Sequence, residues 1–77
     1  MDADLELDCR EMRCPLPIIA LANAIGDIAV DQTMAVVTND PAARADVQAW
    51  CRMRAHEYVG EDAAPDGIAR FVVRRLH

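Results

Sequence analysis

The sequence predicts an α/β (α+β) two-layer sandwich, in which a four-stranded mixed sheet carries two helices on one face. Short segments alternate apolar and polar residues, which is typical of half-buried strands. Two longer segments repeat apolar residues at helical spacing, and each begins beside a proline. The elements follow in the order β-α-β-α-β-β. A right-handed crossover makes the first two strands parallel, and the last two strands form a hairpin. Both helices must then cover the same face of the sheet.

The first half of the chain contains a strand, a loop and a helix. The apolar members of the strand are Leu5, Leu7 and Cys9. After a loop over residues 10–13, Pro15 is the first helical residue, because a proline is tolerated where its missing N–H would lack a partner. Cys14 then takes the N-cap position. The apolar face of this helix holds Ile18, Leu21, Ala22, Ile25 and Ile28.

The second half begins with a strand over residues 33–38 that is apolar on both faces, as expected of an interior strand. Asp40 is a predicted N-cap, and Pro41 is the first residue of the second helix. The buried face of that helix holds Ala43, Val47, Trp50 and Cys51. Strands over 57–61 and 68–75 flank a turn at 64–67. The basic residues expected on the exposed sheet face are Arg70, Arg74 and Arg75.

Length and composition limit the possible functions. The 77 residues form a single domain, 1–77, and 53% of them are hydrophobic. The net charge is −5, which argues against direct nucleic-acid binding through a broad basic surface. All eight basic residues are Arg, so a catalytic lysine is excluded. The N-terminus lacks the pattern of a signal peptide, and no apolar stretch reaches the ~18 residues of a membrane span. A cytoplasmic protein with free thiols is therefore expected.

Cys14 is the main candidate for chemistry. At a helix N-terminus its sulfur would face the positive end of the helix dipole and the N–H groups of Leu16 and Ile18. Both effects favour the thiolate, which is the reactive form, so a lowered pKa is expected. Pro15 and Pro17 would stiffen the first turn and orient the thiol. The alternative is a small buried cysteine that happens to precede the helix.

The other cysteines and a histidine have simpler interpretations beside their functional ones. Cys9 is either a resolving thiol for Cys14 or a half-buried apolar residue. Cys51 belongs to the apolar face of the second helix and is expected in the core. No Cys or His pair has the spacing of a zinc site, so no metal is expected. His56 is expected to be structural or solvated.

Several residues near Cys14 are candidates for supporting roles. Arg10 and Arg13 would hold a thiolate or an anionic sulfur substrate, although ordinary solvated charge explains them equally well. A docking rim would consist of Met12, Arg13, Leu16 and Ile19. For Met12, packing beneath the loop as part of the core is the alternative.

The chain resembles the TusA/SirA/YeeD family of sulfur-carrier proteins in four segments. These are residues 8–17, which contain the Cys-Pro-x-Pro motif, residues 39–42, the pair Trp50-Cys51, and residues 56–58. The resemblance covers Leu5 to Arg75. It implies a fold like the C-terminal domain of translation initiation factor three and a persulfide carried on Cys14. It also implies a sulfur donor such as a cysteine desulfurase or rhodanese, and a downstream sulfur-accepting protein.

The resemblance further implies a sulfurtransferase-type carrier rather than a stand-alone enzyme, with no cofactor beyond the transient sulfur on Cys14. The alternative function is a regulatory or RNA-binding interaction domain of the same fold. Fold analogy alone supports that alternative weakly.

Overall fold

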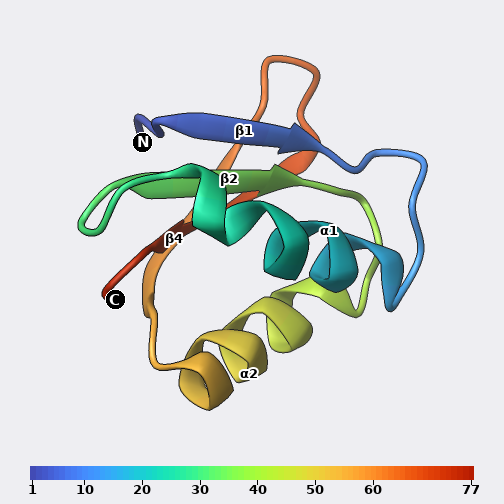
Figure 1. The fold of residues 1–77 in the computed structure, drawn as a ribbon. Helices are drawn as coiled ribbons and strands as arrows, with labels where there is room; N and C mark the ends of the chain where they lie inside the picture. Colours follow the sequence, from blue (N-terminus) through green and yellow to red (C-terminus); the bar gives the residue numbers. More distant parts are fainter.

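Four strands and two helices follow one another in the predicted order in the computed structural model, which describes residues 1–77. In chain order the elements are β1 (Leu5–Asp8), α1 (Leu16–Ala24), the 3-10 turn η1 (Ile25–Asp27), β2 (Thr33–Val37), α2 (Ala43–Arg54), β3 (Glu57–Ala63) and β4 (Ala69–Arg74). Figure 1 shows both helices on the same side of the sheet. The predicted two-layer arrangement is therefore confirmed. Neither helix is long and apolar enough to cross a membrane.

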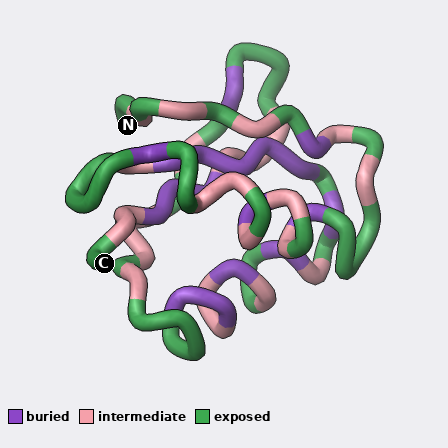
Figure 2. Tube along the Cα trace, viewed as in Figure 1, coloured by how far each residue is buried: buried purple, intermediate pink, exposed green.

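The sheet has the strand order β1-β2-β4-β3. β1 runs parallel to β2, while β4 runs antiparallel to β2 and forms a hairpin with β3. Both pairings agree with the prediction. β2 lies inside the sheet, and residues 34–37 have no exposed surface, as a strand that is apolar on both faces requires. Figure 2 shows this strand as a continuous buried segment.

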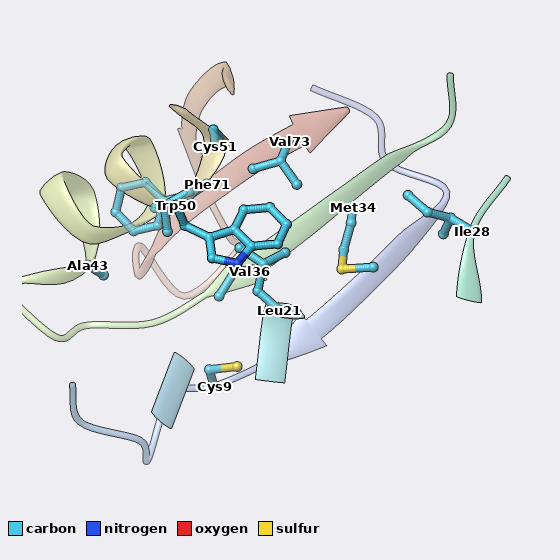
Figure 3. Close-up of a cluster of buried hydrophobic side chains, with 11 residues drawn as sticks. Cys9, Leu21, Ile28, Met34, Val36, Ala43, Trp50, Cys51, Phe71 and Val73 are labelled. Atoms are coloured by element: carbon cyan, nitrogen blue, oxygen red, sulfur yellow. The ribbon is translucent and has the colours of Figure 1, made fainter. Parts of the chain in front are cut away.

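The main core lies between the sheet and the two helices. Alternate residues of neighbouring strands point toward the helices, and the register places Val36 of β2 beside Leu7 and Phe71. Leu21 of α1 and Trp50 of α2 close this layer from the helix side, as Figure 3 shows. The residues predicted for the buried face of α2 are all buried: Ala43, Val47, Trp50 and Cys51.

The face of the sheet away from the helices is covered by charged side chains. The guanidinium of Arg70 in β4 reaches Glu6 of β1 at 2.8 Å and Asp62 of β3 at 3.2 Å. Its side chain is only 11% exposed because these carboxylates flank it, so Arg70 is less solvated than predicted. Arg74 pairs with Glu57 at 3.1 Å and is partly exposed. Arg75 follows β4 and donates to the carbonyl of Ile28.

Most element boundaries differ from the prediction by one or two residues, as is common where the chain enters or leaves regular structure. The larger difference is at the end of the first helix, because α1 stops at Ala24 and continues as η1. Ile28, expected on the helix face, lies beyond η1 in extended conformation but is still buried. α1 begins at Leu16 rather than Pro15, and α2 begins at Ala43 rather than Pro41. β3 continues to Ala63 because its pairing with β4 extends to Ala69. α2 ends at Arg54, and its C-cap residue Ala55 adopts the left-handed conformation with φ 58°.

Candidate functional site

Cys14 lies on the surface, in the loop that leads from β1 into α1. It does not occupy the predicted N-cap position. Pro15 is the N-cap of α1, and the Cys14–Pro15 peptide bond is cis. The N–H of Leu16 donates to the carbonyl of Arg13 at 2.7 Å, so a separate turn precedes the helix. Cys14 is part of that turn and stands one residue before the helix cap.

The N–H groups in the first turn of α1 were expected to stabilise a Cys14 thiolate, but they are bound elsewhere. The N–H groups of Ile18 and Ile19 both donate to the carbonyl of Pro15, at 3.1 and 3.0 Å. The N–H of Leu16 is bound within the preceding turn, and Pro17 has none. The expectation that Leu16 and Ile18 would donate to the sulfur is therefore wrong.

Asp40 connects the start of α2 to Cys14. Its side chain is buried, and one carboxylate oxygen accepts the backbone N–H of Cys14 at 2.6 Å. The other oxygen accepts the N–H of Ala42 at 3.2 Å. Ala42, rather than Asp40, is the N-cap of α2, because residues 41–42 form a turn before the helix. Asp40 thus binds backbone groups at the starts of both helices, which local sequence patterns did not predict.

Asp46, in the first turn of α2, acts directly on the thiol and was missed from the sequence. Its carboxylate lines the same groove as the Cys14 thiol. The interaction with this carboxylate raises the pKa of Cys14, with further contributions from partial desolvation and from the negative charge of Asp40. The predicted lowering of this pKa is therefore wrong. Asp46 approaches Cys14 only because α1 and α2 pack side by side, and no local pattern reports such packing.

A groove of about 260 Å³ opens beside the thiol, between the start of α1 and one side of α2. It is lined by Cys14, Pro15, Ile18, Asp46, Ala49, Trp50 and Met53. Exposed apolar side chains lie nearby in the helices: Leu16 is 52% exposed, Ile19 48% and Met53 77%. Leu16 and Ile19 thus have the exposure that a docking rim requires.

Of the exposed-rim candidates, Met12 does not lie on the surface of the groove, whereas Met53, to which the sequence assigned no role, does. Met12 is partly buried and packs against the core, which favours the core interpretation of this residue. Met53 lines the groove from α2 and is strongly exposed. Its position after the Trp50-Cys51 pair, off the buried face of the helix, is the sequence signal that was overlooked.

The two arginines of the Cys14 loop bind other partners. Arg10 pairs with Asp66 at 2.7 Å and with Asp8 at 3.0 Å, which fixes it to the turn between β3 and β4. The expectation that Arg10 holds a thiolate is not supported, because two carboxylates already bind its guanidinium. Arg13 is exposed and donates to Asn39 at 3.1 Å, beside Asp40.

The other two cysteines are buried in the core. Cys9 is 1% exposed and Cys51 2% exposed, and Figure 3 shows both among apolar side chains. Burial raises the pKa of Cys9, and it raises that of Cys51 to about 11. Cys51 is therefore a core residue, as predicted. Cys9 is not accessible as a resolving thiol, and its interpretation as an apolar residue holds.

His56 has a structural environment. Its Nδ1 accepts the N–H of Leu76 at 3.1 Å, and its ring stacks between Trp50 and His77. Burial and neighbouring cations lower the pKa of His56, so the neutral ring is favoured. No group of three or more His, Cys, Asp or Glu side chains has an arrangement that would hold a metal ion.

A family model described as sulfurtransferase TusA matches residues 5–75. The chain belongs to the TusA family. The fold agrees with the crystal structure of a SirA-like protein from Desulfitobacterium hafniense, with a TM-score of 0.78. That comparison covers 95% of this chain and 99% of the other, at 14% sequence identity, and so concerns the fold alone.

A Bacillus subtilis protein described as "Putative sulfur carrier protein YrkF" is 28% identical over 72 residues. The match covers 94% of this chain but only 39% of YrkF, so this chain spans about two-fifths of that relative. The TusA-family assignment confirms the resemblance drawn from the Cys-Pro-x-Pro motif and the segments that accompany it.

Proposed function

We propose that this TusA-family chain is a sulfur carrier that accepts sulfane sulfur as a persulfide on Cys14 and passes it to an acceptor protein. The observation that carries the proposal is the contrast among its cysteines. Cys14 is exposed at the mouth of an apolar groove, while Cys9 and Cys51 are buried. A carrier has to present its sulfur to other proteins, and only Cys14 can do so.

The proposed chemistry needs no cofactor. The Cys14 sulfur bonds to the outer sulfur of a donor persulfide, and the S–S bond of the donor breaks. The inner sulfur of the donor leaves with the bonding electron pair and takes up the proton that Cys14 has lost. The products are a donor thiol and a Cys14 persulfide, so no external oxidant or reductant is needed. Delivery repeats the same exchange with an acceptor thiolate.

The donor that we propose is a cysteine desulfurase or a rhodanese, because both classes present a persulfide. The chain itself acts as a reaction partner rather than as a stand-alone enzyme. Met53 lines the groove and is strongly exposed, and Leu16 and Ile19 add exposed apolar surface in the first turn of α1, close to Cys14 in the chain. Such surface beside a reactive group supports protein docking. The net charge of −5 continues to argue against direct nucleic-acid binding.

Mass spectrometry of the intact chain tests sulfur loading. After incubation with thiosulfate and a rhodanese, or with cysteine and a desulfurase, the mass should rise by one sulfur atom. Peptide mapping should place the sulfur on Cys14, and a reductant should remove it. Cys14→Ser should abolish loading. Cys51→Ser is the matched control and should load normally if it remains folded.

Sulfur found on Cys9 or Cys51 instead of Cys14 would contradict the assignment. Biological activity that survives intact in Cys14→Ser would favour a regulatory or RNA-binding module.

Met53→Asp tests the docking surface separately from the thiol. The side chain is 77% exposed, so the variant should keep its melting temperature while the rate of loading from a protein donor falls. Val30→Asp is the matched control, because Val30 is also exposed but lies in the loop between η1 and β2. Equal loading rates in the two variants would show that docking does not use Met53.

A further inference from the structure

Asp46 is the only charged residue that lines the groove beside Cys14. It comes from the first turn of α2, whereas Cys14 belongs to the loop before α1. Apart from Cys14 and Asp46, the lining consists of Pro15, Ile18, Ala49, Trp50 and Met53. A carboxylate in such apolar surroundings interacts more strongly with other charges than one in open water does.

The charged groups that act on the thiol, Asp46 and Asp40, are both negative. Asp46 faces it from α2, and Asp40 acts on it from the turn before α2. The first turn of α1 carries no acidic residue, and its residues 16–19 carry no charge at all. The adjacent cation, Arg13, is bound to Asn39. These two carboxylates raise the pKa of Cys14 and so favour its thiol form over the thiolate in the free chain.

A protonated resting thiol is unexpected in a chain that has to attack a persulfide, because the thiolate is the nucleophile. This conflict would be resolved if a docking protein supplied a group that neutralises the effect of Asp46 on the Cys14 thiol. An arginine or lysine is suited to that role, since it pairs with a carboxylate and its own charge also favours a neighbouring thiolate.

We propose that Asp46 is the specificity-determining residue of the Cys14 site, and that it pairs with an arginine or lysine which a docking protein places beside its own reactive sulfur. This inference rests on the proposed carrier function and names the chemistry of the partner. In the free chain Asp46 favours the protonated form of Cys14, and this limits the reaction of the thiol with small electrophiles. In the complex the partner's cation binds Asp46, and the thiol proton passes to the departing sulfur of the donor.

Alkylation of Cys14 by iodoacetamide measures the first half of this role. In Asp46→Asn the pH at which half the maximal rate is reached should fall, and the rate at pH 7 should rise roughly three- to tenfold. Asp46→Glu should retain the slow reaction. Asp27→Asn removes the same charge at the far end of the helix layer, in η1, and should react like the unaltered chain. An unchanged profile in Asp46→Asn would overturn the proposal.

Thiol–disulfide exchange with charged disulfides tests whether Asp46 recognises a cation beside a reactive sulfur, and it needs no identified partner protein. The unaltered chain should react faster with cystamine, which carries ammonium groups, than with the uncharged bis(2-hydroxyethyl) disulfide. Because the two disulfides differ in intrinsic reactivity, the quantity to compare is their rate ratio in the two proteins. That ratio should fall about five- to tenfold in Asp46→Asn, and the difference should shrink as salt is added. Equal ratios in both proteins would refute recognition of a cation by Asp46.

Both assays use the thiol alone and involve no persulfide. A chain that fails to load sulfur would contradict the carrier function while leaving these two measurements interpretable. A chain that loads sulfur on Cys14 but shows no charge preference would contradict only the role of Asp46. Thermal unfolding should accompany each variant, and Asp46→Ser provides the same test if Asp46→Asn fails to fold.

Discussion

Each helix is preceded by an ionisable residue and a proline, Cys14-Pro15 before α1 and Asp40-Pro41 before α2. The side chains of these two ionisable residues have opposite environments, since Asp40 is buried and Cys14 is exposed. Before α2, Asp40 turns its carboxylate inward and binds the N–H groups of Ala42 and Cys14. Before α1, Cys14 binds nothing at its own helix and leaves its sulfur on the surface. The N–H of Cys14 is satisfied by the other helix start.

This difference shows how the backbone of an exposed cysteine is held in place while its side chain stays on the surface. The backbone of Cys14 is fixed by a hydrogen bond to a buried carboxylate, so its side chain has no structural duty. Asp40 is 8% exposed and bonds two backbone groups that are 28 residues apart, since they belong to residues 14 and 42. One helix start supplies the support, and the other presents the thiol.

Asp40→Ala is the change that should damage this arrangement most. Two N–H groups lose a charged acceptor, and we expect the free energy of unfolding to fall by about 2–4 kcal/mol. Urea unfolding followed by Trp50 fluorescence measures the loss. Asp40→Asn keeps a single acceptor oxygen and should lose roughly half as much. A loss in Asp40→Ala no larger than that of a surface substitution would show that the carboxylate does not support both starts.

Serine substitutions of the cysteines should separate the exposed thiol from the buried ones. In Cys51→Ser a hydroxyl replaces a thiol in an apolar core, which should cost about 1–3 kcal/mol. In Cys14→Ser the hydroxyl is exposed, and the change should stay within about 0.5 kcal/mol. Equilibrium unfolding of both variants under reducing conditions makes the comparison. A large loss in Cys14→Ser would mean that its side chain has a structural role after all.

A modest stabilising effect is expected at the opposite end of α2, where Ala55 has a positive φ. Its N–H donates to the carbonyl of Cys51, as in a left-handed helix cap. Glycine adopts this conformation without the clash of a Cβ atom, so Ala55→Gly should stabilise the chain by about 0.5–1 kcal/mol. Thermal unfolding would show a rise of a few degrees. A lower melting temperature would indicate that α2 ends differently.

The fold could be predicted from the sequence because each strand and helix carries its own local pattern. The order of elements follows from three local patterns. These are the alternation of apolar and polar residues at Leu5 and Leu7, the strand around Val36 that is apolar on both faces, and the proline near the start of each helix. Chain connectivity then restricted the topology to a parallel pair followed by a hairpin. The main errors were at the helix starts, where the turns before Leu16 and Ala43 displaced both caps.

The site could be predicted only in part. Cys14 could be singled out because its proline context is local, and the structure exposes it beside the groove. Its pKa was predicted in the wrong direction because the decisive carboxylate, Asp46, lies on the other helix. Met53 was missed for the same reason, since the groove exists only between packed helices. A single sequence reports the residues of a helix face but not which residues of a second helix lie beside it.

The exposed apolar side chains near the thiol, Leu16, Ile19 and Met53, also limit how long any complex can last. So few contacts fit an interface in the small, transient class, below about 1,200 Å². With a Kd of ~10 µM and an association rate constant of ~10⁶ M⁻¹s⁻¹, such a complex dissociates in roughly 0.1 s. Under the proposed carrier function, a short residence time would let one surface serve a donor and an acceptor in turn, because the first would leave before the second arrives.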